Sequence, residues 1–209
     1  MPLYKSIHFD EFTRIHLWKL TESEVDLHVG IKLKPSSSKR LQSMNSELHR
    51  KGFLSIRHLL KIEALTDDDL YYDDMGKPHL ENDFYISITH SFEFTAIIVS
   101  SKRAVGIDVE KQRDKILKIA PKFSTYPLVE RHSNTPEIIT KLTCIWGAKE
   151  SIYKIYPKPG LSFLKHIDID DFHMEDKKTT GHIHFNEARV YFDIHFEAVE
   201  NYCLVYALA

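Results

Sequence analysis

The chain has few cysteines, little net charge and no long apolar run. Only two cysteines occur among its 209 residues, Cys144 and Cys203, and both stand in apolar segments. This usage favours reduced core thiols in a cytoplasmic protein over a disulfide. With a net charge of −2, the chain shows no broad electrostatic attraction to nucleic acid or to an anionic membrane.

Targeting and membrane-spanning segments are also missing from the pattern. The first residues, MPLYKSIHFDEF, lack the basic and apolar regions of a signal peptide. No apolar run approaches the length that is needed to cross a bilayer. We therefore expect neither a membrane nor a nucleic acid as a partner.

The hydrophobic fraction of 43% is enough for a sizeable core, in one domain or in two small halves. Helical periodicity runs over 43–60 and 136–156, where Pro136 suits a first turn and Pro157 ends the helix. Strand-like runs occupy 12–20, 26–33, 84–90, 94–100, 104–110 and 163–169, and the pattern continues through the C-terminal residues 182–185, 189–199 and 201–208.

Each long helix is thus accompanied by short strands whose short loops favour antiparallel pairing. The pattern predicts an α+β fold with two similar halves related by a pseudo-twofold, each a long helix on a small antiparallel sheet. We place the N-terminal half at 1–110 and the C-terminal half at 111–209, with a linker near 111–135 that includes helical turns near 113–123 and 127–132.

Two acids stand at alternate positions of the run VGIDVE, residues 105–110. Side chains alternate across a strand, so Asp108 and Glu110 share one face with Gly106, which leaves room for a ligand. Hard oxygen ligands of this kind suit Mg²⁺. The alternative is a strand end with two solvated acids.

A third acid and two lysines lie in WGAKESIYK, residues 146–154. Lys149 falls in the middle of an apolar helical face, where a lysine must extend to the surface or meet an anion. Glu150 stands at the edge of that face, four residues before Lys154, and the alternative for this pair is an ordinary helical ion pair.

The remaining polar candidates are weaker when read alone. Lys77 follows a turn at Met75-Gly76, and His90 ends an otherwise apolar strand face, so both also fit plain structural roles. The histidines of HIHF, His182 and His184, have no cysteine or acid at a zinc-like spacing. Basic residues gather before and within the first long helix: Lys39, Arg40, Arg50, Lys51 and Arg57.

The order of the motifs is more specific than any one of them. GKPHL, ISITHS, VGIDVE, WGAKESIYK and KPGLSF follow one another over roughly residues 40–170. This series resembles the 4′-phosphopantetheinyl transferase superfamily, in particular its larger single-chain, pseudo-dimeric branch of the surfactin-synthetase-activating type.

The resemblance implies roles for individual residues. Asp108, Glu110 and Glu150 match the metal-binding acids, and Lys149 and Lys154 match lysines near the pyrophosphate of coenzyme A. Lys77, Thr89 and His90 match residues around its nucleotide end, and Arg50, or else Lys51 or Arg57, matches a basic position that also meets coenzyme A. The implied catalytic set is Asp108, Glu150 and Lys154, with Mg²⁺ or Mn²⁺ as the metal.

The same resemblance implies transfer of 4′-phosphopantetheine from coenzyme A to a serine of an acyl or peptidyl carrier protein, with release of 3′,5′-ADP. It also implies that the protein is a monomer and holds coenzyme A between its halves. The alternatives are a non-catalytic module that binds coenzyme A or the carrier, and a metal-dependent phosphohydrolase. Four positions depart from the family pattern: Ser87 and Thr89 in SITHS, Gly147 after Trp146, which should loosen its helical turn, and Pro127 in a segment implied to contact the carrier.

Overall fold

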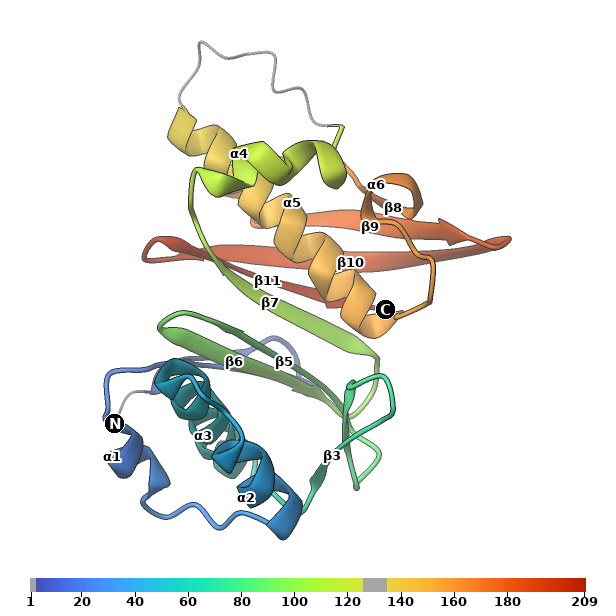
Figure 1. Ribbon diagram of the computed structural model, residues 1–209. Coiled ribbons are helices and arrows are strands. Elements are labelled where there is room, and N and C mark those ends of the chain that lie inside the picture. Colours follow the sequence, from blue (N-terminus) through green and yellow to red (C-terminus); the bar gives the residue numbers. More distant parts are fainter. Residues whose placement is uncertain (1–2, 126–134) are drawn as a thin grey trace. The chain divides into compact units, whose positions relative to one another are not determined.

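The computed structural model describes residues 3–125 and 135–209. Its internal contacts divide the chain into two units, Met1–Arg103 and Ala104–Ala209. Each unit has its own sheet and its own long helix, as Figure 1 shows. The observed mixture of helices with antiparallel sheets confirms the α+β class.

The first unit is built on a four-stranded antiparallel sheet with the order β1-β2-β6-β5. Its helix α3 begins after Ser46, whose hydroxyl accepts a hydrogen bond from the His49 amide, and its apolar side packs against β2 and β6. The elements of this unit are β1 (Leu3–His8), β2 (Thr13–Lys19), α1 (Glu24–His28), α2 (Pro35–Gln42), α3 (Glu47–Ile62), β3 (Leu70–Tyr72), β4 (Pro78–Leu80), β5 (Tyr85–Ser91) and β6 (Phe94–Ser100).

The second unit is built on a five-stranded antiparallel sheet with the order β7-β11-β10-β9-β8. The long helix α5 crosses one face of this sheet and packs mainly on β7 and β11 (Figure 1). Its elements are β7 (Val105–Lys111), α4 (Lys115–Ile119), the 3₁₀ turn η1 (Ala120–Lys122), α5 (Thr135–Ile155), α6 (Phe163–His166), β8 (Ile167–Ile169), the 3₁₀ turn η2 (Met174–Asp176), β9 (Lys178–Phe185), β10 (Ala188–Val199) and β11 (Tyr202–Leu208).

The core of the second unit explains why α5 lies where it does. Leu142, Ala148 and Ile152 of the helix are buried in one cluster with Ile183 and Val205 of the sheet. Cys144 and Cys203 join this cluster as free thiols, and their burial confirms that both belong to the core. The helix ends at Ile155, two residues before Pro157, as predicted.

Two local predictions were wrong, and a third is not tested. Residues 26–33 do not form a strand, because Ser23 and Asp26 make a capping box that starts the short helix α1. Residues 163–166 form the helical turn α6 before β8, with the Ser162 hydroxyl as its N-terminal cap. The expected helical turn at 127–132 lies outside the described residues.

The strand that carries Asp108 also pairs differently from the expectation. Short loops favoured pairing of β6 with β7, but β7 pairs with β11, with Asp108 opposite Val205. The observed division after Arg103 therefore assigns β7 to the second unit, whereas the predicted boundary after residue 110 assigned it to the first. Among the described residues, no helix is both long enough and apolar enough to span a membrane.

Candidate functional site

The second unit carries the three predicted acids on two elements that pack against each other. Asp108 and Glu110 are on β7, and Glu150 is on α5, the helix that packs on this strand. Burial raises the pKa of Glu150 to about 7, and the negative charges of Asp108 and Glu110 act in the same direction, against Lys154. Glu150 therefore responds to both strand carboxylates, but the carboxylate oxygens of the three acids, all in the described part of the chain, do not all lie within 4.8 Å of one another.

Lys154 is the cation within this group. Its Nζ donates hydrogen bonds to Asp108 Oδ1 at 2.9 Å and to the Ile107 carbonyl at 2.7 Å. The Asp108 side chain is 8% exposed and that of Lys154 is 27% exposed, so the pair lies at the border between core and solvent. Lys154 therefore makes its ion pair from the helix to the strand acid Asp108, and it acts on Glu150 as a nearby positive charge.

Two glycines allow α5 to lie close to the sheet, one against β7 and one against β11. A Cβ on Gly106 would lie 1.9 Å from the Ser151 carbonyl oxygen, and a Cβ on Gly147 would lie 2.8 Å from Val205 Cγ2. The room at Gly106 is therefore taken by the helix backbone, and the expectation that a ligand approaches there was wrong. Gly147, expected to loosen its helical turn, instead permits close packing of the helix on β11.

Lys149 takes a different direction from Lys154. Its side chain is buried, and its Nζ donates to the carbonyl oxygens of Phe163 at 2.7 Å and Ile167 at 2.5 Å, at the two ends of α6. Burial lowers the pKa of Lys149 to about 8, and Asp168 opposes that shift. The buried Lys149 ammonium is therefore satisfied by two backbone carbonyls, where the sequence had offered an anion as one alternative.

A pocket of about 430 Å³ lies within the first unit. Its wall combines the predicted residue His90 with Gly76 and Pro78, which flank Lys77. Burial lowers the pKa of Lys77, and Asp73 opposes this shift. Arg40 and Arg57 also line the pocket, so the cavity joins cations to apolar side chains such as Phe53 and Ile88.

The structure separates other predicted residues from this pocket. Arg50 pairs with Glu24 of α1 at 2.8 Å and donates to the Met44 carbonyl, so α1 holds its guanidinium. Thr89 is buried and alternates with the pocket residues Ile88 and His90 along β5. Arg57, by contrast, lines the pocket, where it forms a buried ion pair with Asp67 and burial lowers its pKa.

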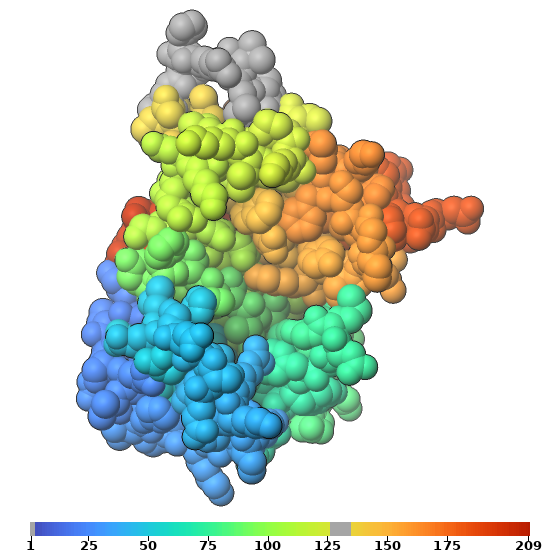
Figure 2. All heavy atoms as spheres, viewed as in Figure 1, coloured from blue at the N-terminus to red at the C-terminus, as the bar shows by residue number. Residues whose placement is uncertain are grey.

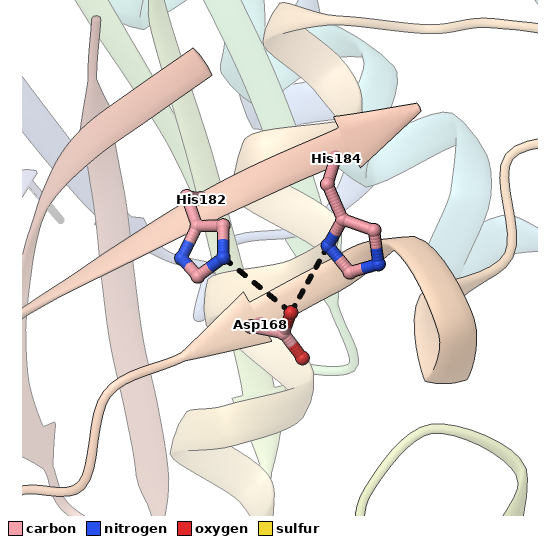
Figure 3. A group of neighbouring side chains, drawn as sticks. All are labelled: Asp168, His182 and His184. Atoms are coloured by element: carbon pink, nitrogen blue, oxygen red, sulfur yellow. Dashed lines mark ion pairs between the residues drawn. The ribbon is translucent and has the colours of Figure 1, made fainter. Parts of the chain in front are cut away.

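Sequence reasoning missed a second group of side chains in the second unit. Asp168 of β8 lies beside His182 and His184 of β9, and Figure 3 shows its carboxylate between the two rings. The acid that seemed absent at a zinc-like spacing comes from the neighbouring strand, where Asp168 stands opposite His182. The pairing of β8 with β9 would have to be known before this group could be found.

Comparison with known proteins agrees with this geometry. Residues 104–207, nearly the whole second unit, match the model of the 4′-phosphopantetheinyl transferase superfamily. The chain belongs to this superfamily. A 4′-phosphopantetheinyl transferase gsp from Aneurinibacillus migulanus is 26% identical over 171 residues, which cover 75% of this chain and 69% of that relative.

Membership of the superfamily gives the enzyme class, that of a phosphopantetheinyl transferase. The matched region holds both β7 and α5, and therefore the acids Asp108, Glu110 and Glu150 together with Lys154. The pocket that contains His90 lies in the first unit, outside the region that the family model matches.

Proposed function

We propose that this protein transfers the 4′-phosphopantetheine group of coenzyme A to a serine of an acyl or peptidyl carrier protein and releases 3′,5′-ADP. One observation carries the proposal: inside the region that matches the superfamily, the packed elements β7 and α5 hold Lys154 against Asp108, and the pKa of Glu150 responds to the charges of Asp108, Glu110 and Lys154. Grouped carboxylates repel one another, and a divalent cation removes that cost.

The donor set fits Mg²⁺ or Mn²⁺. Asp108, Glu110 and Glu150 offer carboxylate oxygens only, and hard cations of this kind prefer oxygen ligands. These residues would hold the ion, which when bound supplies positive charge to the pyrophosphate of coenzyme A.

The side chains around the acids supply the rest of the chemistry. The carrier serine oxygen forms a bond to the β-phosphorus, the bond from that phosphorus to the bridging oxygen breaks, and 3′,5′-ADP leaves. Glu150 is the proposed acceptor of the serine proton, and Asp108 fixes the position of Lys154 by their 2.9 Å contact. The Lys154 ammonium offsets the charge that develops on the leaving phosphate.

The first unit is proposed to hold the nucleotide end of coenzyme A. Lys77 and His90 are the proposed contacts at the pocket, and Arg40 adds a cation there. Arg50 and Thr89 stay proposed contacts on the resemblance alone; Arg50 would have to leave Glu24 to bind a phosphate. For Lys149, we propose a positioning role in place of direct contact with pyrophosphate, because it holds the carbonyls around α6.

Further parts of the proposal concern the molecule as a whole. Each unit carries a long helix on an antiparallel sheet, which supports a pseudo-twofold pair of similar halves that acts as a monomer. The two free thiols fit the reducing cytoplasm. Carriers of fatty-acid, polyketide or nonribosomal-peptide synthesis all present the serine that this reaction needs.

One assay tests the proposed function. The protein is incubated with coenzyme A, Mg²⁺ and an apo carrier protein, the carrier is weighed by mass spectrometry, and the nucleotide is measured. We expect a carrier heavier by one phosphopantetheine and an equal amount of 3′,5′-ADP. Nucleotide without a heavier carrier would indicate a phosphohydrolase, and bound coenzyme A without either product would indicate a binding module; both results contradict the proposal.

A further inference from the structure

The group at Asp168 is arranged in the manner of a metal site. Asp168 Oδ2 lies 3.1 Å from His184 Nδ1 and 3.5 Å from His182 Nε2. All three ligand atoms lie within 4.8 Å of one another. With metal–nitrogen and metal–oxygen distances of about 2.0–2.2 Å, tetrahedral ligands stand about 3.3 Å apart. Two of the three separations already have this value within a few tenths of an ångström.

Strand pairing holds the three side chains in place. His182 and His184 alternate with Ile183, which is fully buried in the core, so both rings project from the opposite face of the sheet. Asp168 stands opposite His182 in the register of β8 with β9, and it reaches the same face (Figure 3). The site is therefore fixed by backbone hydrogen bonds between strands, and no loop has to move to assemble it.

Neighbouring rings restrain both histidines. The His182 ring lies 5.6 Å from the Tyr191 ring of β10, and the His184 ring stands edge-on to His166 at 6.2 Å between centroids. His166 itself is no ligand in this arrangement, because its Nδ1 accepts a hydrogen bond from the Ser162 amide and its Nε2 then carries the hydrogen of a neutral ring. Such packing orients a ligating imidazole.

Solvent reaches the group through an open pocket. The pocket measures about 490 Å³ and is lined by all three side chains and by residues 185–189, which form the β9–β10 turn and the strand ends on either side of it. That hairpin projects from the body of the second unit in Figure 2. The side chains of Asp168 and His184 are 49% and 48% exposed, so an ion can enter and a water can complete its coordination.

We propose that Asp168, His182 and His184 bind one divalent transition-metal ion of the zinc class, at a site distinct from the acids of β7 and α5. Two imidazole nitrogens and one carboxylate oxygen form a donor set that suits Zn²⁺, whereas Mg²⁺ prefers oxygen alone. The ion joins β8 to β9, and β8 is the strand whose Ile167 carbonyl accepts from Lys149. Binding there stabilises the second unit.

Zinc titration of the untagged, chelator-treated protein by calorimetry tests the site, with the visible spectrum of bound Co²⁺ as a second readout. We expect one ion per chain in the wild type and binding weakened by at least about tenfold in His184→Asn and in Asp168→Asn. Bound Co²⁺ should show the intense bands of a tetrahedral nitrogen and oxygen site, and these should disappear in both variants. His28→Asn removes an exposed imidazole at the end of α1 in the first unit and should bind as the wild type does.

The Glu150→Gln variant distinguishes this site from the acids. We expect it to keep the zinc affinity and the Co²⁺ spectrum of the wild type. Loss of binding in Glu150→Gln together with unchanged binding in His184→Asn would place the ion at the acids and overturn the proposal, as would a wild type that takes up no zinc. Circular dichroism monitors folding, and since both replaced side chains are half exposed, either variant alone decides the question.

Discussion

At the scale of single residues, Glu150 is the side chain on which the proposed chemistry depends most. It is the member of the acid group that comes from α5, and burial together with Asp108 and Glu110 raises its pKa to about 7. A carboxylate in such surroundings gains from a neighbouring cation and can accept a proton near neutral pH. Its removal should therefore affect both metal binding and transfer.

We expect Glu150→Gln to fold and to lower the transfer rate by at least about 100-fold, because a lost metal ligand removes several kcal/mol of transition-state stabilisation. The measurement is the mass shift of the carrier with coenzyme A and Mg²⁺. Added Mg²⁺ should raise the melting temperature of the wild type and leave that of the variant nearly unchanged. Glu137→Gln, an exposed change in the first turn of the same helix, is the control. Near-wild-type transfer by Glu150→Gln would remove this residue from the mechanism.

Substitution of Lys149 should mainly lower stability, whereas substitution of Lys154, on the same helix, should mainly lower kcat. Lys149→Met leaves two carbonyl acceptors without their donor and should cost about 2–4 kcal/mol of unfolding free energy, measured with denaturant. Lys154→Met removes the cation beside Asp108 and should lower kcat by about 100-fold at saturating Mg²⁺. A large kcat loss in a stable, folded Lys149→Met variant would instead show that Lys149 contacts the reacting phosphate.

The sequence pointed to the acids for a local reason. Alternation along β7 and spacing along α5 are short-range patterns, so Asp108, Glu110, Glu150 and Lys154 could be found before the fold was known. The direction of Lys149 could not, because it depends on carbonyls of α6, a turn that was itself read as a strand. The role of Asp168 was missed for the same reason, since its partners His182 and His184 lie on another strand.

At the scale of elements, the contact between β7 and α5 decides whether the acids meet. Gly106 allows the Ser151 carbonyl to come so close that an added Cβ would lie 1.9 Å from it. A backbone atom cannot swing aside as a side chain can, so a methyl group here must push the helix from the strand. The position of Glu150 relative to Asp108 therefore depends on a residue that takes no part in the chemistry.

We expect Gly106→Ala to destabilise the protein by about 3 kcal/mol or more, at the upper end of what overpacking costs, and to reduce transfer in the molecules that stay folded. Urea unfolding and the carrier assay measure the two effects. Gly52→Ala, in the middle of α3, is the matched control. Its Cβ would meet Thr95 Cγ2 of β6 at 3.5 Å, an ordinary contact distance. Because alanine favours the helix more than glycine does, stability should be unchanged or slightly higher. Equal stability of the two variants would contradict the close packing described.

A second element contact joins the end of α3 to β2. Glu63 follows the helix, and its carboxylate, 5% exposed, pairs with Arg14 at 2.6 Å and with His16 at 2.5 Å. Burial by itself raises the pKa of Glu63, but the hydrogen bonds from His16 and Arg14 outweigh it and lower the pKa to about 2. This carboxylate therefore stabilises the folded state while it is ionised.

The sign of the pH effect follows from that shift. Between the ordinary pKa of 4.5 and about 2, the unfolded chain binds more protons at this residue, so its stabilisation is complete above pH 4.5 and is lost as the pH falls towards 2. Glu63→Gln should cost about 2–4 kcal/mol near pH 6 and clearly less near pH 3, as measured by urea unfolding. A difference between wild type and variant that does not change with pH would show that the ion pair contributes nothing.

At the scale of the whole molecule, the assignment of β7 to the second unit decides which unit carries the acids and which carries the pocket with His90. The predicted boundary assigned β7, the strand of Asp108 and Glu110, to the first unit, because short loops suggested that β5, β6 and β7 pair in sequence. Pairing of β7 with β11 joins residues about as far apart as the second unit allows, and loop length carries no information on such a contact. As a result, the acids and Lys154 belong to one unit, and the pocket with His90 belongs to the other.

This division predicts that substitutions in the two units have different kinetic effects. Lys77→Met should raise KM for coenzyme A by about tenfold or more with little change in kcat, because its proposed contact is with the nucleotide end in both ground and transition states. With 3′-dephospho-coenzyme A as donor, the same variant should differ little from the wild type. Lys154→Met should lower kcat for both donors, and Lys32→Met, an exposed loop change in the first unit, should alter neither constant.

The comparison of donors identifies the contact as well as the unit. If Lys77 binds the 3′-phosphate, the ratio of kcat/KM for the two donors collapses in Lys77→Met, and the wild-type preference weakens with salt. An equal loss with both donors would move Lys77 away from the 3′-phosphate and towards the adenine or the pyrophosphate. A fall in kcat that matches the fall in kcat/KM would place Lys77 with the acids in the chemical step, and would refute the division of work between the two units.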